Sequence, residues 1–273
     1  MDPLLRVNQN GFRTGRSKLP QILTLRRLIE GIKQKQLPAI LTFVDFSKAF
    51  DSTHRGKLME ILKAYGIPTK IVDAISLLYK DTEAQVIISD GNTEFFEFFL
   101  FIIALDYALR EFEATRETRT GFTLTPRQSS CNLATYITDT DFADDLALIS
   151  DYLEEAQLLL LSLEVAAKTV GLHVNYKKTE YMLYNQPIRD LVTLGGNKLK
   201  QVDNFKYLGS WIQSSEKDMN VRIGQACIAL NKMMKVWKSN LKKHLKVGFF
   251  RATVVSVRLY GDECLYGDWK YEE

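Results

Sequence analysis

Three aspartates stand where predicted strands end, and carboxylates placed in this way can hold metal ions. Asp45 follows a short apolar run, and Asp144 and Asp145 lie between two further strand-like segments. Adjacent strands lie about 4.8 Å apart, so carboxylates at their ends could share one site. Close carboxylates repel one another and call for a divalent cation, and oxygen-only ligands favour Mg²⁺ or Mn²⁺ over zinc. Two such ions would lower the pKa of an attacking hydroxyl and stabilise a leaving phosphate.

The same residues also have an ordinary structural explanation. Adjacent aspartates at a hairpin tip are common turn residues, and an aspartate that follows a strand often caps the next helix. Spacing alone favours this structural role, because one sequence determines topology poorly.

The elements that must position these aspartates follow from the spacing of apolar residues. Helical spacing predicts helices over 22–32, 58–65, 71–79, about 101–112 and 153–170, and a helical pattern from Asp218 onward. Strand-like runs cover 39–44, 135–140, 146–150, 172–174, 181–184 and 204–212, with hairpins over 85–96 and 135–150. Strands and helices alternate without regular βαβ spacing, so the sequence predicts an α+β fold rather than a doubly wound sheet.

Composition narrows the class of protein. The 273 residues are 46% hydrophobic and 25% charged, which is typical of a folded globular protein and excludes disordered, collagen-like and coiled-coil classes. Three cysteines without a CxxC pair argue against a disulfide framework or a structural zinc site. The start does not have the pattern of a signal peptide, and the most apolar run, Phe98–Leu105, is far short of a membrane span. We therefore expect an intracellular protein, nuclear or cytoplasmic, that is not secreted and has no membrane partner.

Charge is distributed unevenly along the chain. The formal net charge is +3, yet an acidic first part is followed by a strongly basic block from Ile188 to Arg251. Between Met219 and Gly261 there are nine Lys or Arg and no Asp or Glu. Apolar residues recur at every third or fourth position in this part of the chain, which predicts one apolar helical face. Its members are Ile223, Cys227, Leu230, Met234, Trp237, Leu241 and Leu245.

Lysines such as Lys235 and Lys242 fall largely off this face. They could simply form a solvated surface, or they could contact the phosphates of a nucleic acid, which would make binding sensitive to salt. The absence of acidic residues favours phosphate contact.

Five blocks in a fixed order resemble the motifs of reverse transcriptases, specifically those of non-LTR (LINE-type) retrotransposons. Two blocks hold the aspartates: FVDFSKAFDS at 43–52 and FADD at 142–145. The others are NQNGFRTGRS at 8–17, GLHVNYKKT at 171–179 and FKYLG at 205–209, and RLYG at 258–261 is similar to a segment that often follows. The resemblance covers nearly the whole chain and overrides the structural explanation of the aspartates.

The resemblance implies roles for single residues. Asp45 and Asp144 would hold two metal ions, with Asp145 beside them. Phe46 and Phe50 would belong to the nucleotide pocket, where Phe50 matches the steric gate that crowds the ribose 2′-OH. A core position is equally compatible with the pattern at Phe50.

Further matches concern the triphosphate and the nucleic acid. Lys178 matches a lysine near the triphosphate. Arg13 and Arg16 would contact template or phosphate. The primer end would be set by Tyr207, Leu208 and Gly209, and Lys235 and Lys242 would contact the duplex. For the lysines and arginines the alternative is a solvated side chain, and for the last block it is an ordinary hairpin turn.

The resemblance also implies an architecture. We expect a reverse-transcriptase-like palm, an antiparallel sheet with packed helices, followed by a helical thumb-like region. Residues 1–38 would be a remnant of the fingers, 39–215 the palm with a primer-grip-like hairpin, and 216–273 the basic thumb-like region. The partners would be an RNA template, a DNA primer and a dNTP, and no specific protein partner is indicated.

One family block has no counterpart. Reverse transcriptases of this type carry GxxQGxxLSP or GxxQGxxLAP, which contacts the templating pair and the incoming nucleotide, whereas residues 91–102 read GNTEFFEFFLFI. Few residues precede Asp45, so most of the fingers are not expected. The chain therefore resembles part of a retroelement polyprotein that has lost an internal piece.

Three hypotheses for function remain open from the sequence. The chain is an RNA-directed DNA polymerase that works by two-metal catalysis, or an inactive remnant that still binds RNA or RNA–DNA duplex, or a pseudogene product with no retained role. The missing block favours the second and third.

Overall fold

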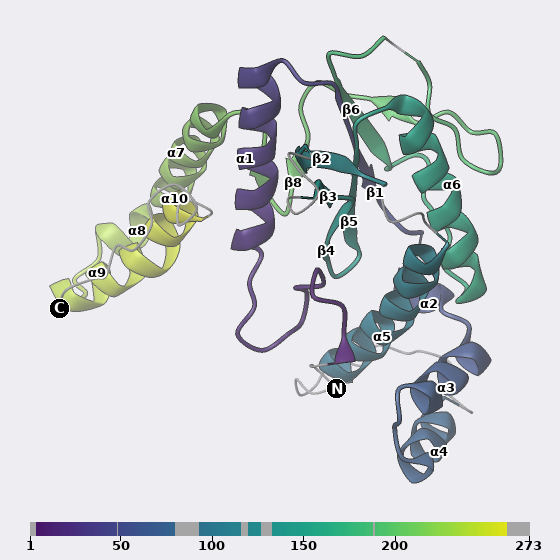
Figure 1. Cartoon of the computed structure of the whole chain (residues 1–273). Coiled ribbons are helices and arrows are strands. Elements are labelled where there is room, and N and C mark those ends of the chain that lie inside the picture. The colour runs from purple at the N-terminus through teal and green to yellow at the C-terminus, as the bar shows by residue number, and fades with distance from the viewer. Residues whose placement is uncertain are drawn as a thin grey trace. The chain divides into compact units, whose positions relative to one another are not determined.

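A computed structural model of the chain describes residues 4–47, 49–79, 93–115, 120–126, 133–187 and 189–260. The chain forms two compact units, one of Met1–Ser17 with Gln36–Asp203 and one of Lys18–Lys35 with Asn204–Glu273. Helices and strands are labelled in Figure 1. These units are defined by compactness and do not coincide with the predicted boundaries after residues 38 and 215. The predicted boundaries separate functional regions (fingers, palm and thumb), and that division stays a prediction.

A five-stranded sheet carries the first unit, in the order β4-β5-β1-β6-β7. Its strands are β1 Ala39–Val44, β4 Asp139–Phe142, β5 Asp145–Ser150, β6 Glu180–Tyr184 and β7 Lys200–Gln201. Neighbouring strands pair antiparallel except β6 and β7, which are parallel, so the expected antiparallel sheet is corrected at this edge. All six residues of the central strand β1 are buried, as its apolar sequence predicts.

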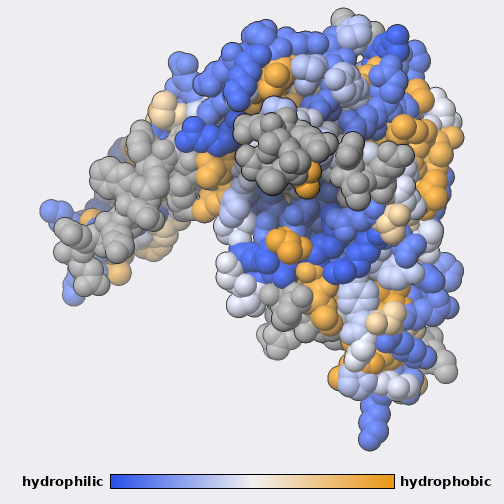
Figure 2. Space-filling model, in the orientation of Figure 1, coloured by the Kyte–Doolittle hydropathy of each residue, from blue (hydrophilic) through white to orange (hydrophobic). Residues whose placement is uncertain are grey.

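Five helices of the described residues belong to the first unit. They are α2 Ala49–Ser52, α3 Arg55–Ala64, α4 Thr69–Leu78, α5 Thr93–Ala114 and α6 Leu153–Thr169. Helix α6 packs on β1 and β5, and α5 packs on α6 and on α3 (Figure 1). Leu159, Leu160 and Leu163 of α6 are buried, while Leu158 and Val165 are exposed, and Figure 2 shows apolar residues on the outer surface over α6.

The start of α5 corrects one prediction. Residues 94–96 were expected in a hairpin strand, and the helix was expected from about residue 101, but α5 begins at Thr93. Its 22 residues contain neither Gly nor Pro, so nothing in the sequence breaks the helix between the two segments. The other part of the expected hairpin, residues 85–92, lies outside the described residues.

The second predicted hairpin is confirmed with altered bounds. Strand 135–140 is divided into β3 Thr135–Ile137 and β4, and β3 pairs with β2 Phe122–Thr125 in a separate two-stranded sheet. The expected strand 172–174 is reduced to an isolated bridge between Val174 and Phe46.

The second unit is mainly helical. It contains α1 Leu19–Lys35, β8 Lys206–Tyr207, β9 Ser210–Trp211, α7 Ser215–Lys232, α8 Met234–Trp237, α9 Lys243–Phe250, the π-helical turn η2 Arg251–Val255 and α10 Ser256–Leu259. Ser214 caps α7 by accepting a hydrogen bond from Lys217 N at 3.2 Å. Among the described helices of the whole chain, none is both long and apolar enough to cross a membrane.

Buried ion pairs tie the β8–β9 hairpin to α1 and α7. Asp218 Oδ2 accepts from Arg26 at 2.7 Å and from Arg222 at 3.2 Å, while its Oδ1 accepts from Trp211 N at 2.9 Å. Arg222 also donates to the carbonyl of Gly209 at 2.8 Å. These contacts explain why α1 belongs to the same unit as the C-terminal helices.

The single apolar face predicted after Met219 is wrong. The helix is interrupted between α7 and α8 and again between α8 and α9. Lys246 Nζ donates to the carbonyls of Trp237 and Ser239 at 2.8 and 2.6 Å, which stabilises the chain after the end of α8. Apolar residues of the predicted face are also exposed, among them Ile223, Met234, Leu241 and Leu245.

Candidate active site

Strand register brings the aspartates to one end of the sheet. Val44 at the end of β1 lies opposite Leu146 of β5, so the next position places Asp45 beside Asp145. Phe142 pairs with Asp145 across β4 and β5, which leaves Ala143 and Asp144 as a two-residue turn. This turn, Ala143–Asp144, is called the catalytic turn below.

The three carboxylates act on one another. Loss of hydration raises the pKa of Asp145 to about 6, and repulsion from Asp144 and then Asp45 adds to this shift. Loss of hydration and repulsion from Asp45 also raise the pKa of Asp144, against a lowering effect of its own main-chain N–H and of Lys178. The sheet therefore concentrates negative charge at this end, as the sequence predicted.

Asp145→Asn is expected to stabilise the apo protein. The pKa of Asp145 is higher in the folded chain than its ordinary value near 3.9, so folding favours the protonated carboxyl. The contribution of this group to stability is complete below about pH 4 and is lost as the pH rises through about 6. Because Asp145 is exposed, solvent screening reduces the effect to about 1 kcal/mol. Chemical denaturation at pH 7.5 and pH 4 should show the gain at the higher pH only, and an equal gain at both would contradict the assignment.

A segment from His173 to Thr179 wraps the end of β1. Asn175 N donates to the carbonyl of Asp45 at 2.8 Å, and Asp45 N donates to Thr179 Oγ1 at 3.2 Å. The turn between them carries Lys178, whose Nζ lies 3.8 Å from Asp45 Oδ2 with the side chain 70% exposed. The predicted lysine is thus beside the carboxylates and reaches solvent.

The donor chemistry of this site fits a hard divalent cation. Asp45 Oδ2 is buried and accepts no hydrogen bond from the described residues. Within the described ranges, no three His, Cys, Asp or Glu side chains form a group that could hold a metal ion by themselves. Mg²⁺ is commonly held by one or two carboxylates together with substrate phosphates. Asp45 and Asp144 thus offer only carboxylate oxygens, which are the donor atoms that such a cation prefers.

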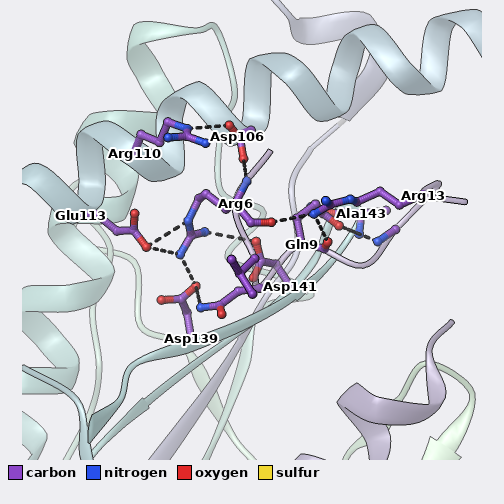
Figure 3. A network of polar contacts seen from close by, with 12 residues as sticks. Arg6, Gln9, Arg13, Asp106, Arg110, Glu113, Asp139, Asp141 and Ala143 are labelled. Atoms are coloured by element: carbon purple, nitrogen blue, oxygen red, sulfur yellow. Dashed lines mark hydrogen bonds and ion pairs between the residues drawn. The ribbon is translucent and has the colours of Figure 1, made fainter. Parts of the chain in front are cut away.

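A buried polar network lies behind the catalytic turn (Figure 3). Arg6 donates to Asp139 at 2.6 Å, to Asp141 at 3.1 Å and to Glu113 at 2.6 Å. Burial lowers the pKa of Arg6, but the attraction of the carboxylates outweighs this and raises it above the ordinary value. Burial raises the pKa of Asp141 to about 7 even though Arg6 lowers it. Asp139 and Asp141 belong to β4, so the network anchors the strand that leads into the turn.

Not every residue predicted in the first unit lies at the surface of the site. Phe46 is 5% exposed and belongs to the apolar core, so its side chain is not available to a nucleotide. Arg13 is also buried and donates to the carbonyls of Arg6 and Gln9, which corrects its expected contact with the template. Arg16 is exposed and donates to the carbonyl of Val7. The backbone of Phe50 lies in α2, and its side chain is outside the described part of the structure.

The residues predicted to set the primer end form a tight hairpin in the second unit. Leu208 and Gly209 have φ of 48° and 82°, as a type I′ turn requires. Tyr207 is buried, so it supports the hairpin from inside rather than offering its ring to a primer. Tyr260 donates to the carbonyl of Leu208 at 3.2 Å, so the RLYG segment contacts this turn through its tyrosine. Lys235 and Lys242 are both exposed.

Sequence reasoning missed Arg6, Asp139, Asp141 and Glu113, and it assigned no role to Gln9. Asp139 and Asp141 are two apart in a strand, so both side chains lie on the same side of it. A pair of carboxylates at this spacing in a buried strand is a signal for a buried cation, although the sequence does not say which residue supplies it.

Comparison with known proteins identifies the family. Residues 1–212 match the sequence model of the family described as reverse transcriptase (RNA-dependent DNA polymerase). The chain belongs to the reverse transcriptase family. The mixed helices and sheet fit the α+β fold expected of this family.

One curated relative of this chain is an uncharacterized transposon-derived protein of Caenorhabditis elegans. The two are 28% identical over 134 residues, which is 46% of this chain and 48% of the relative. The aligned part thus spans about half the length of the curated relative.

Proposed function

We propose that this reverse transcriptase chain derives from a non-LTR retrotransposon and that its site performs RNA-directed DNA synthesis. The primer 3′-OH attacks the α-phosphate of a dNTP, an O–P bond forms, and the bond to the β-phosphate breaks with release of pyrophosphate. The observation that carries the proposal is the meeting of Asp45, Asp144 and Asp145 at one end of the sheet with Lys178 beside them.

Each side chain has a role in this proposal. Asp45 and Asp144 would hold Mg²⁺ or Mn²⁺, and Asp145 adds negative charge next to them. Such ions, when bound, would supply charge neutralisation at the phosphates and favour ionisation of the attacking hydroxyl. Lys178 lies close enough to Asp45 to attract the triphosphate and to give a proton to the leaving pyrophosphate. The experiment is extension of an oligo(dT) primer on poly(rA) with dTTP and either cation.

A second candidate, binding of RNA or RNA–DNA duplex without catalysis, is favoured by the structure of α5. The residues that replace the expected glycine-containing block are helical from Thr93 onward. A helix there presents no glycine-rich loop to a templating base pair. The basic helices of the second unit could bind a duplex independently of the aspartates.

Exchanging Lys235 and Lys242 for glutamine is expected to weaken duplex binding equally for all sequences. If each lysine contacts one phosphate, the slope of log affinity against log salt should fall by about 2 in the double variant. Filter binding of an RNA–DNA duplex across several salt concentrations measures this slope.

The matched control for these lysines is Lys63→Gln with Lys70→Gln, two exposed lysines of the first unit. The control should keep the parental slope. A parental slope in the Lys235 and Lys242 variant would remove both residues from the interface.

A further inference from the structure

We propose that Gln9 is a positioning residue for the catalytic turn. Its side-chain amide holds the main chain of Ala143 and thereby fixes Asp144 and Asp145 beside Asp45. The inference rests on the proposed function, because that function gives the carboxylates their catalytic role.

The contacts of Gln9 satisfy both main-chain groups of one turn residue (Figure 3). Gln9 is fully buried, and its Oε1 accepts from Ala143 N at 2.8 Å while its Nε2 donates to the carbonyl of Ala143 at 3.3 Å. The same Oε1 accepts from Gly11 N at 2.7 Å. A buried main-chain group without a partner is costly, so the amide stabilises this turn conformation against others.

The turn requires outside support because its backbone is strained. Ala143 has a φ of 55°, in the left-handed region that residues with a Cβ rarely adopt. Gly11 lies directly against it: a Cβ at Gly11 would come 2.3 Å from Ala143 N. The loop and the turn are therefore in contact through their main chains, which only glycine permits at position 11.

The loop that carries Gln9 is itself fixed to β4. Gln9 forms a parallel bridge with Asp141, and Asn10 N donates to the carbonyl of Asp141 at 3.1 Å. Arg13 closes the loop by donating to the carbonyls of Gln9 at 2.9 Å and Arg6 at 2.7 Å. Since Arg6 is held by the buried network, the main chain that carries Gln9 is fixed in position next to the turn.

The amide of glutamine is the group that the geometry requires. Glutamate has the same length, but its carboxylate cannot donate to the carbonyl of Ala143 and would add a negative charge near the aspartates. Methionine has a similar length and makes neither hydrogen bond. These two substitutions therefore separate the two halves of the interaction.

Gln157 offers a matched control. Its Oε1 accepts from Val192 N at 2.9 Å and its Nε2 donates to the carbonyl of Val192 at 2.6 Å, so it makes the same pair of hydrogen bonds to one residue. Neither residue belongs to the candidate site. Gln157→Met thus loses the same pair of hydrogen bonds at a place outside the candidate site.

The test uses two readouts on the metal-free chain: amide hydrogen exchange, and ¹³C carboxyl signals of labelled aspartate assigned with Asp144→Asn and Asp145→Asn. Gln9→Met should speed exchange at Ala143 on the order of tenfold and move the signals of Asp144 and Asp145. Gly11→Ala should move the same signals. Gln157→Met should speed exchange at Val192 and leave the carboxyl signals in place.

Two outcomes would overturn the proposal: unchanged carboxyl signals in folded Gln9→Met, or an equal change in Gln157→Met. If Gln9→Met does not fold, Gln9→Asn is judged by the same criteria, because its shorter amide cannot reach both main-chain groups of Ala143 and adds no charge. A failure of the proposed function is recognised separately, because it appears as absent primer extension by a parent chain whose carboxyl signals still respond to Gln9.

Discussion

Replacing Arg6 by methionine is expected to destabilise the first unit by about 3–5 kcal/mol, the usual effect of removing one partner from a buried charge network. Arg6 and its partners Asp139 and Asp141 are each 5% exposed or less. Without the guanidinium, two buried carboxylates and the partly exposed Glu113 lose their cation. The loss should be largest above pH 7, because burial raises the pKa of Asp141 to about 7 and its carboxyl is ionised above that pH.

Two control variants make this prediction specific. Arg27→Met removes an exposed pair with Glu30 and should change stability by less than about 0.5 kcal/mol. Asp141→Asn should be tolerated far better than Arg6→Met, because the raised pKa of Asp141 means that this carboxyl is substantially protonated near neutral pH. Urea denaturation of the three variants measures the differences. Similar losses in Arg6→Met and Arg27→Met would contradict the role given to the network.

Replacing Asp144 by asparagine is expected to abolish primer extension while leaving the fold intact. Asp144 lies on the catalytic turn, where it is partly exposed and acts electrostatically on Asp45. Loss of one carboxylate removes several kcal/mol of charge stabilisation at the phosphates, and each 1.36 kcal/mol changes the rate tenfold, so the decrease should be on the order of 10³-fold.

The same variant should be at least as stable as the parent. Asparagine keeps the size of the side chain and removes repulsion from the other carboxylates, so activity and stability should change in opposite directions. Thermal unfolding measured beside primer extension tests this combination. A drop in activity accompanied by unfolding would show only that the turn had been damaged.

Much of the site was predictable from local sequence. The apolar run of β1 predicts a buried strand that ends at Asp45, and the two strand-like runs around Asp144 predict a hairpin. Lys178 followed from the motif resemblance, and the structure places it beside Asp45. The strand and hairpin predictions succeeded because strand periodicity and turn residues are local properties.

Other features depend on tertiary contacts that a motif does not encode. Matching a motif does not reveal whether a side chain points inward. The burial of Arg13 and Tyr207 could therefore not be predicted from their motifs. Arg6 reaches Asp139 across 133 positions in the sequence, so only the folded register shows the pairing. Periodicity after Met219 predicted one helical face, because spacing alone does not detect the breaks on either side of α8.

The central claim is that Asp45, Asp144 and Asp145 form one catalytic site for RNA-directed DNA synthesis. The most direct measurement compares extension of oligo(dT) on poly(rA), with Mg²⁺ or Mn²⁺, by the parent chain and by folded Asp45→Asn and Asp144→Asn. We expect the parent to incorporate dTTP and both variants to lose incorporation by on the order of 10³-fold. Equal extension by parent and variants, including no extension by any of them, would contradict the claim.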